Sequence, residues 1–600
     1  MSGHRISQLV AHDHKHFGAE LFQQAEDLRQ AGAIDAAIST YRQALEVSPG
    51  MAEAHNNLAV LLSQQGDALG AIRHYRAAIA LVGKHAGLYF NMAGALEAAG
   101  QAGEAIAAYR RAVDLAPDLV SAWNDLGRLL HATSDLDAAQ ASLEQALRLD
   151  SAHALAWANL ATVLKDQGDV GAAHASALRA VQSDPGLYLG WSNLLFSLPY
   201  LSDTLAASDM AAIHAAFDAA TGSQVAAHLP CRPVRASERL RIGYVSADFR
   251  DHAVTYFFEP ALAHHDCRQV EVVCYDLGVA DAVNERLRRT GTATWRDCAA
   301  LDDHALAALI ESDQIDVLVD LMGHTADNRL PVFVRRPAPI QVSWLGWPAT
   351  TGLSVFDFVL ADAHVDAGEA APLRGPERVW PLPRTWLCYR PDATAPDVSL
   401  PPSLTGRAPT FGSFNGIYKI TPRVVRVWAE ILRQVPDGRL LIAGVPSDGA
   451  KRRLVELFGR EAIAPDRLDL HAPVSLARFF ELHAEVDVAL DPFPFNGATT
   501  TLHTLWMGVP VVTLAGSTHA GRMGLGILRN LGLDDHVADD RAQYVALAVA
   551  LAGAPTRLHA LRLGMRTRMQ ASALLDEQGF VADLEAAFLG MRALIRSVET

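Results

Sequence analysis

Apolar positions in the first third of the chain recur every 34 residues. One such position holds Leu58, Met92, Leu126, Leu160 and Leu194, and another holds His55, Tyr89, Trp123, Trp157 and Trp191. Small residues at 59, 93, 127 and 161 and turn residues at 32, 66, 100, 134 and 168 keep the same register. Repetition at this length predicts stacked helix–turn–helix units. We expect five units over residues 18–187 and the first helix of a sixth near Trp191.

After residue 236 the pattern changes to short apolar, β-branched runs separated by segments of helical length. A first set lies at 239–246, 270–276, 315–321, 339–346 and 356–362, and a second at 410–415, 438–444, 467–472, 486–491 and 509–516. Such alternation predicts parallel sheets covered by helices on both faces. We therefore expect a flexible tail (1–17), repeats (18–196), a helical linker (197–236) and two Rossmann-like domains (237–395 and 405–600), with a closing helix packed back across a domain interface.

Ligands of parallel sheets bind beyond the carboxyl ends of the strands. In the first sheet, a polar cluster that ends at His252 follows the first run, and a cluster from Asp320 to Thr325 follows the third. A neutral imidazole accepts a proton near pH 7, so His252, or His324 held by Asp320, is a candidate base. Trp344 and Trp347 are candidates for an aromatic wall or for core packing.

The second sheet contributes a candidate phosphate site. Asp491–Gly497 forms a loop, and Thr499, Thr500 and Thr501 then begin a helix. The free N–H groups and dipole of a helix N-terminus attract anions. Lys419 follows the first strand of this sheet and would face the same crevice, where it would suit a diphosphate. Arg522 is a second candidate partner for phosphate.

Composition narrows the class of protein. A formal net charge of -16 argues against nonspecific nucleic-acid binding. The sequence contains no run of about 18 apolar residues, so we expect no membrane-spanning helix. The N-terminus lacks the apolar core of a signal peptide. Five widely spaced cysteines without a Cys-x-x-Cys pair indicate reduced thiols and a cytoplasmic protein. The sole Asp-x-Asp, Asp135 and Asp137, lies inside the repeats, so we expect no metal requirement.

Two parallel-sheet domains that face a crevice, without a metal cluster, describe a nucleotide-sugar glycosyltransferase of the GT-B type. In this reading Lys419 and the helix N-terminus stabilise the leaving nucleotide, and the sugar passes through an oxocarbenium-like transition state. A histidine takes the proton of the acceptor hydroxyl. Whether His252 or His324 does so stays open at this stage.

The repeats resemble tetratricopeptide repeats. Together with RLRIGYVSADFRDH, VDLMGHT, RRPAPIQVSWLGWPATTGL, FGSFNGIYKITP, LDPFPFNGATTT and MGVPVVTLAG, they resemble the protein O-GlcNAc transferase and SPINDLY family over residues 18–600. The resemblance implies inverting sugar transfer to Ser or Thr of proteins held by the repeats. It places His252 near the reacting sugar, Lys419 and the threonines Thr499 and Thr500 on the diphosphate, and Asp320 with His324 in a second cluster.

A column of amides also repeats every 34 residues. Amides donate to and accept from an extended peptide backbone, so a column of them can hold a chain without reading its sequence. Within the family this column resembles the amide ladder that binds acceptor chains. Its members are Asn57, Asn91, Asp125, Asn159 and Asn193.

Departures from the family pattern fall among the residues expected to bind the sugar donor. Asn415, Tyr418 and Gly497 are further candidates for donor binding. His503 stands where an acidic residue is common, Phe479 replaces a histidine, Gly416 replaces a larger polar residue, and Ala498 replaces His or Thr. UDP-GlcNAc is the first expectation for the donor, and GDP-fucose, the SPINDLY donor, is its rival. A non-catalytic scaffold with a decayed transferase domain is the alternative class, and a homodimer stays open.

Overall fold

The computed structural model describes residues 2–224, 239–366, 368 and 375–599, with side chains described for 16–222, 239–366, 368 and 375–597. It divides into two compact units, Met1–Val163 and Leu164–Thr600. The first unit contains most of the repeats. The second contains the end of the repeats and both sheets.

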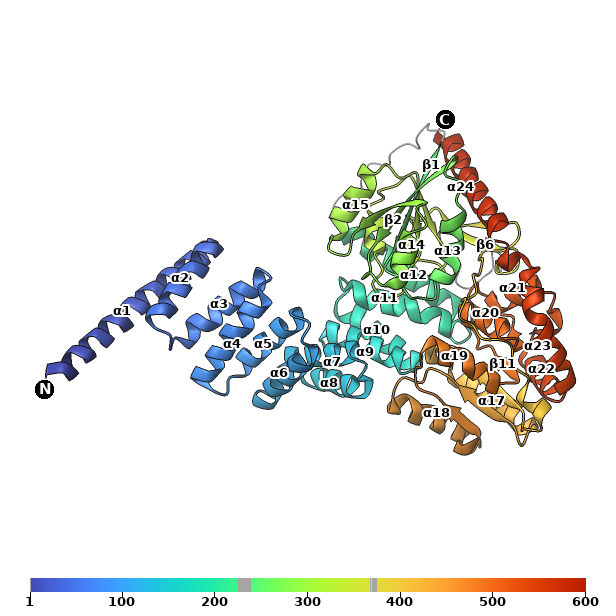
Figure 1. Ribbon diagram of the computed structural model, residues 1–600, viewed down its shortest axis with the longest axis horizontal. Coiled ribbons are helices and arrows are strands. Elements are labelled where there is room, and N and C mark those ends of the chain that lie inside the picture. Colours follow the sequence, from blue (N-terminus) through green and yellow to red (C-terminus); the bar gives the residue numbers. More distant parts are fainter. Residues whose placement is uncertain (1, 225–238, 367, 369–374, 600) are drawn as a thin grey trace. The chain divides into compact units, whose positions relative to one another are not determined.

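The repeat region consists of paired helices, as the 34-residue period predicts. The helices of the first unit (blue in Figure 1) are α1 (Ser2–Gln30), α2 (Ile34–Val47), α3 (Ala52–Gln64), α4 (Ala68–Val82), α5 (Ala86–Ala98), α6 (Ala102–Leu115), α7 (Val120–Ala132) and α8 (Leu136–Leu149). Helices α9 (Ala154–Asp166), α10 (Val170–Ser183) and α11 (Tyr188–Ser197) complete five pairs and open a sixth.

The small and turn positions of the repeat have direct structural reasons. A Cβ atom at Gly127 would lie 2.6 Å from Leu143 Cγ, so this contact between helices requires a very small residue. Gly32, Gly66, Gly100 and Gly168 adopt positive φ in the turns, and Ser134 takes the same conformation at φ 65°. The predicted turns are therefore confirmed.

Residues 2–17 of the expected tail are helical, because α1 begins at Ser2. No proline or glycine lies between His4 and Phe17, so this stretch contains no helix-breaking residue that would end α1 before it reaches the N-terminal residues. The expected linker is helical, with η1 (Leu198–Leu201) and α12 (Ala207–Gln224). Met210 and Phe217 of α12 are fully buried, and residues 225–236 lie outside the described part of the chain.

The first sheet has seven parallel strands in the order β3-β2-β1-β4-β5-β6-β7. They are β1 (Leu240–Ser246), β2 (Val270–Asp276), β3 (Ala293–Asp297), β4 (Val317–Asp320), β5 (Ile340–Ser343), β6 (Phe358–Asp362) and β7 (Arg378–Leu382). The apolar runs predict five of these strands. They miss β3 and β7 because both are edge strands that carry charged side chains and are only partly buried.

The second sheet has six parallel strands in the order β10-β9-β8-β11-β12-β13. They are β8 (Thr410–Ser413), β9 (Arg439–Ile442), β10 (Leu468–Leu470), β11 (Val488–Leu490), β12 (Val511–Leu514) and β13 (Val537–Ala538). Five match the predicted runs, and β13, two residues long, does not follow from the pattern.

Helices cover both sheets. Those between the strands of the first sheet are α13 (Thr255–His264), α14 (Ala282–Arg288), α15 (Asp303–Ser312) and α16 (Leu330–Val334). Those of the second are α17 (Pro422–Gln434), α18 (Asp448–Arg460), α19 (Leu476–Leu482), α20 (Thr499–Trp506), α21 (Met523–Asn530), α22 (Arg541–Ala552) and α23 (Pro555–Gln570). Among the described residues no single helix is long and apolar enough to cross a membrane, although α22 and α23 pass that test together as a bent pair.

The last helix, α24 (Glu577–Glu599), returns to the first sheet and packs against α13, β5 and β7 (Figure 1). Glu585 of α24 accepts a hydrogen bond from the backbone N–H of Asp266 at 2.8 Å, and its Oε1 lies 2.8 Å from Nδ1 of the buried His265. The expected closing helix across a domain interface is confirmed.

The end of the repeats packs on the second sheet domain within the same compact unit. A Cβ atom at Gly168, in the turn before α10, would lie 2.8 Å from Ile417 Cγ1. Arg423 at the start of α17 forms an ion pair of 2.7 Å with Asp203, which follows η1. Because Ile417 belongs to the same short segment as Lys419, these contacts tie the repeat end to the candidate site.

Candidate active site

A cavity of about 250 Å³ lies beyond the carboxyl ends of the strands of both sheets. Its lining comes from three parts of the chain. The repeat end contributes Phe196 and Tyr200, the first sheet contributes His252 and Trp347 among others, and the second contributes Asn415, Tyr418, Lys419, Phe495, Thr499 and Thr500. The expected crevice is therefore present as one open cavity that residues from all three parts line.

Lys419 ends the short helix η3 (Ile417–Lys419), directly after β8. Its ammonium donates a hydrogen bond of 2.7 Å to the Asn496 carbonyl and lies 4.5 Å from the centre of the Phe495 ring. Burial lowers the pKa of Lys419 to about 8, and the nearby carboxylate of Asp491 opposes this shift. The side chain is thus a cation at neutral pH that has lost most of its hydration. An anion bound in the cavity would interact strongly with this charge and offset the cost of its lost hydration.

Asp491 organises the loop that precedes the threonines. Its Oδ1 accepts the backbone N–H of Gly497 at 2.7 Å, and its Oδ2 accepts the Thr513 hydroxyl at 2.6 Å. Burial raises the pKa of Asp491, while hydrogen bonds from Thr513, Gly497 and Thr501 and the charge of Lys419 act to lower it. Thr501 is therefore engaged with this carboxyl group and does not line the cavity.

Thr499 and Thr500 begin α20 and line the cavity. The residue before the helix, Ala498, makes no side-chain capping bond, so its side chain leaves the first N–H groups of α20 to other partners. The Thr500 hydroxyl donates to Asn415 Oδ1 at 2.9 Å, which links the threonine loop to the Lys419 segment. The part of the cavity lining that comes from the second sheet domain therefore contains two hydroxyls, a helix N-terminus and a buried ammonium.

His252 lines the same cavity from the first sheet domain. It follows β1 and has a side chain that is 35% exposed. Its Nδ1 lies 3.4 Å from Oδ2 of the buried Asp248. Burial lowers the pKa of His252 although Asp248 acts to raise it, so the ring is neutral at pH 7 and has the protonation state of a base.

The expectation that Asp320 holds His324 is wrong. The Asp320 carboxyl group accepts the backbone N–H groups of Met322 and Gly323, at 3.2 and 2.7 Å, and burial raises its pKa to about 7. His324 Nε2 donates to the Thr351 carbonyl at 2.8 Å, and burial lowers the pKa of His324 to about 3.

Neither residue lines the cavity. The turn at Gly323 explains this position. Gly323 has φ +56°, and a Cβ atom there would lie 2.1 Å from Trp347 Cβ, so the turn carries His324 underneath Trp347. The His324 ring packs edge-on against Phe217 and Trp347, with centroid distances of 5.3 and 5.8 Å. The candidate base is therefore His252.

Besides Thr501, four predicted donor residues lie outside the cavity lining, namely Gly497, His503, Phe479 and Arg522. His503 forms a 2.6 Å hydrogen bond with the Tyr389 hydroxyl and packs edge-on against Phe479, and burial lowers its pKa to about 4. The Arg522 side chain donates to the carbonyls of His364 and Gly516, at 2.8 and 3.3 Å. The polar groups of His503 and Arg522 are therefore engaged with other protein groups.

The structure adds cavity residues that the sequence reasoning missed, among them Phe196, Tyr200, Phe495 and Met523. Phe495 lies in a loop that the sequence did mark, so its position could have been anticipated. Tyr200 carries no local signal, because it follows a repeat helix and reaches the cavity only through packing of the repeat end on the second sheet.

The amide column lies on the first helix of each repeat, but several of its members are bonded within the array. Asn57 donates to Glu26 Oε1 at 2.7 Å, and the buried Asn159 donates to Asn124 Oδ1 at 3.0 Å. Asp125 accepts from Asn124 at 3.0 Å, and Asn91 is half-buried. Asn193 lies on α11 in the second compact unit. Whether the column binds acceptor chains stays a prediction.

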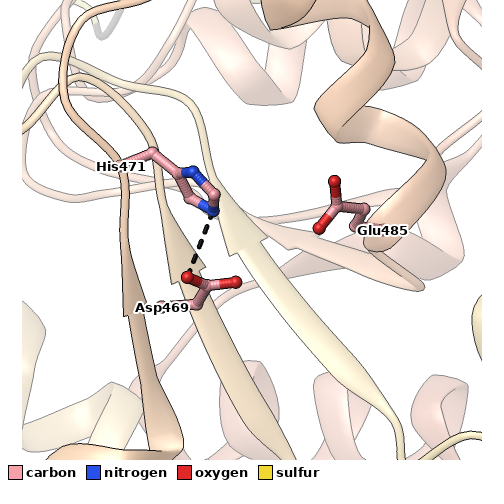
Figure 2. Close-up of side chains that lie close together, drawn as sticks. All are labelled: Asp469, His471 and Glu485. Atoms are coloured by element: carbon pink, nitrogen blue, oxygen red, sulfur yellow. Dashed lines mark ion pairs between the residues drawn. The ribbon is translucent and has the colours of Figure 1, made fainter.

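Potential metal ligands do not gather in the cavity lining. Within the described residues, one group of three, Asp469, His471 and Glu485, brings its ligand atoms within 4.8 Å of one another. His471 Nε2 lies 3.2 Å from Asp469 Oδ1, an ion pair drawn in Figure 2. Arg478 donates to Glu485 Oε1 at 2.9 Å. The charge of Glu485 is thus already balanced. Asp135 of the Asp-x-Asp pair caps the N-terminus of α8 through the N–H of Ala138.

Comparisons with known proteins agree with the division of the chain into repeats and two sheet domains. Residues 214–386 and 402–584 match glycosyl transferase family 41. The tetratricopeptide repeat matches residues 22–86, 61–120, 90–139 and 124–188. The two matches cover the sheet domains and the repeat helices respectively.

Among curated proteins, the chain is 40% identical over 360 residues to a protein of Solanum lycopersicum named "Probable UDP-N-acetylglucosamine--peptide N-acetylglucosaminyltransferase SPINDLY". It is 30% identical over 375 residues to an Arabidopsis thaliana protein whose name differs only in ending SEC. These alignments cover 59% and 61% of this chain but 38% of each relative. The chain thus spans well under half the length of the curated relatives it matches.

Among solved structures, the chain is similar to a mutant of the Thermobaculum terrenum O-GlcNAc transferase. The TM-score is 0.78 at 32% sequence identity, and the match covers 86% of this chain and 98% of that one. Repeats followed by two parallel sheets therefore recur together in a protein of similar size.

Proposed function

The chain belongs to glycosyl transferase family 41, and we propose that it is an inverting enzyme that moves a sugar from a nucleotide donor to Ser or Thr hydroxyls of proteins. The observation that carries this proposal is that groups of both sheet domains line one cavity. Lys419, Thr499 and Thr500 come from the second sheet domain and His252 from the first. The repeats supply a surface for the acceptor protein.

The proposed reaction follows from the charges of these groups. His252 accepts the proton of the acceptor hydroxyl as its oxygen bonds to the anomeric carbon, while the bond from that carbon to the diphosphate oxygen breaks. Attack from the face opposite the diphosphate inverts the anomeric configuration. Lys419, the threonine hydroxyls and the α20 N–H groups stabilise the charge that develops on the departing diphosphate.

Protein and helix groups thus provide the positive charge that a metal ion would otherwise supply to the diphosphate. We therefore propose a reaction that does not depend on a divalent cation. Turnover should be the same in EDTA as in added Mg²⁺ or Mn²⁺, and a strict need for either ion would contradict this part of the proposal.

For the donor we propose UDP-GlcNAc, because the SPINDLY, SEC and O-GlcNAc transferase relatives all carry N-acetylglucosamine in their names. GDP-fucose stays the rival, since the sequence departs from the O-GlcNAc transferase pattern at Phe479 and His503. Both residues are packed against other aromatic rings.

The deciding experiment is mass spectrometry of proteins after incubation of the chain with a cell lysate and either donor. N-acetylhexosamine on Ser or Thr would support UDP-GlcNAc, and deoxyhexose would support GDP-fucose. Lys419→Ala should abolish the modification, whereas Lys451→Ala, on the exposed face of α18, should not. Modification that persists in Lys419→Ala would refute the proposed role of this cavity.

The alternative of a scaffold with a decayed site makes a different prediction for nucleotide binding. A working site should be stabilised by UDP or GDP, by about 2.7 kcal/mol at a nucleotide concentration 100 times Kd. A shift in the unfolding midpoint that is absent with both nucleotides would favour the scaffold.

A further inference from the structure

Tyr200 lies in η1, directly after the last repeat helix, and lines the cavity that contains Lys419. Its ring stacks on Phe495, with a centroid distance of 4.5 Å and an interplanar angle of 5°. The rings of Phe196 and Tyr418 lie 5.2 and 5.4 Å from it. Because three aromatic neighbours hold the ring, its orientation does not depend on its hydroxyl group.

The hydroxyl of Tyr200 has no hydrogen-bond partner among the residues that the structure describes, although the residue is only 3% exposed. Other buried tyrosines of this unit do have partners. Tyr544 donates to the Asp491 carbonyl at 2.9 Å, and the Tyr244 hydroxyl lies 3.0 Å from His265 Nε2. The Tyr200 hydroxyl is therefore open to the cavity and free to hydrogen-bond a ligand there, while the rest of the residue is packed among aromatic rings.

Burial also holds the pKa of Tyr200 well above its ordinary value, so the hydroxyl keeps its proton and can donate it to an acceptor atom. The cavity offers this donor two kinds of ligand, the donor nucleotide sugar and the acceptor polypeptide. The position of Tyr200 along the chain separates the two.

The groups suited to the diphosphate, Lys419, Thr499 and Thr500, all come from the second sheet domain. Tyr200 instead belongs to a rim that begins in the repeats. Lys165 of α9 lies 5.1 Å from the centre of the Phe196 ring, and Phe196 in turn lies 5.2 Å from Trp347 at the cavity wall. A polypeptide that follows the last repeats into the cavity would pass Phe196 and Tyr200, the lining residues that the repeat end contributes.

We propose that Tyr200 is an acceptor-binding residue whose hydroxyl donates a hydrogen bond to a backbone carbonyl of the acceptor polypeptide beside the reacting Ser or Thr. A backbone carbonyl is present at every position of an extended chain, so this contact orients acceptors of many sequences. The end of the repeat array then forms part of the transfer site itself. This inference rests on the proposed function.

The test is Tyr200→Phe, which keeps the ring and its stacking and removes only the hydroxyl. One hydrogen bond corresponds to roughly a 3- to 10-fold effect, so KM for an acceptor peptide should rise by about that factor. KM for the donor and the stabilisation by nucleotide should not change. Tyr275→Phe is the matched control, because it removes a hydroxyl that donates to Asp313 Oδ2 at 2.9 Å outside the cavity lining, and acceptor KM should stay unchanged.

The experiment separates failure of the Tyr200 inference from failure of the proposed sugar transfer. If wild-type protein transfers sugar and Tyr200→Phe has an unchanged acceptor KM, the inference is wrong and the proposed function stands. If donor KM rises instead, Tyr200 contacts the sugar nucleotide and the inference is also wrong. If the wild-type protein transfers nothing from either donor, the proposed function fails and this inference with it.

Discussion

At the scale of single residues, burial is the property that gives Lys419 and His252 their proposed chemistry. Burial lowers the pKa of both side chains, so Lys419 loses its proton more readily than a surface lysine and His252 is neutral at pH 7. A cation that stabilises the leaving group and a neutral base can then act together in the same pH range.

The pKa of Lys419 predicts an alkaline limit to activity. The ammonium is charged below its pKa of about 8 and loses its charge as the pH rises through that value. We therefore expect kcat/KM to fall above about pH 8, measured as a pH–rate profile at constant ionic strength. Arginine does not titrate in this range, so Lys419→Arg should be less active but should lack this alkaline limb. The same limb in that variant would assign it to another group.

Substitution of His252 is predicted to lower turnover, whereas substitution of His324 is predicted to lower stability. His252→Ala removes the proposed base, so kcat should fall by about 10²–10⁴ while nucleotide still stabilises the protein. His324→Ala removes a buried ring that donates to Thr351, so it should lower the free energy of unfolding by about 1–3 kcal/mol. The turnover of the folded His324→Ala protein should stay within a few-fold of wild type. Loss of nucleotide binding in His252→Ala would contradict its role on the acceptor side.

At the scale of elements, the connection from β11 to α20 leaves no space beside Gly497. A Cβ atom there would lie 2.5 Å from Thr501 Oγ1, 2.7 Å from Thr500 Oγ1 and 2.9 Å from Asn415 Oδ1. The hydroxyls of Thr500 and Thr501 therefore converge on a glycine. The carboxylate of Asp491, at the start of this loop, accepts the Gly497 N–H at 2.7 Å and helps to hold the glycine in this position.

Gly497→Ala should accordingly displace the threonines. We expect nucleotide affinity to fall by at least about tenfold, which corresponds to about 1.4 kcal/mol, as measured by calorimetric titration with UDP or GDP. Gly564→Ala is a matched control, because no heavy atom lies within 4 Å of its Cβ position on an exposed turn of α23. Alanine there should leave affinity unchanged and should not lower stability. Equal affinities in the two variants would contradict the phosphate role of this loop.

At the scale of the whole molecule, the described chain forms two compact units, and the last repeat helices belong to the same unit as the cavity. The repeat end contributes Phe196 and Tyr200 to the cavity wall, whereas most of the amide column lies in the first unit. Donor binding is therefore expected to depend on the second unit alone, whereas capture of a protein acceptor should depend on both units.

A chain that begins at residue 151, before α9, tests this separation. It should show the same nucleotide-induced rise in unfolding temperature as the full chain. Transfer to protein acceptors should fall by roughly 100-fold because the additional binding surface is lost. Transfer to a short peptide should change little and serves as the control. Equal losses for peptide and protein would show that the first repeats support the cavity itself.

Much of the architecture is determined by local sequence. The 34-residue period places the repeat helices and their turns, because apolar periodicity and positive-φ residues act over a few neighbouring positions. The buried strands follow from apolar runs, and Lys419, Thr499, Thr500 and His252 follow from their places after those runs. The edge strands β3 and β7 escape this reasoning because a charged, half-exposed strand has no apolar run to mark it.

Only the tertiary structure decides which of these side chains share a cavity. His324 and His503 follow the same sequence logic as His252 and Lys419, yet packing directs them to the Thr351 carbonyl and the Tyr389 hydroxyl. Tyr200 has no local signal and reaches the cavity through its stack with Phe495. The physical reason is that periodicity and turn chemistry are short-range properties of the chain, whereas the lining of a cavity depends on close packing between segments that are far apart in sequence.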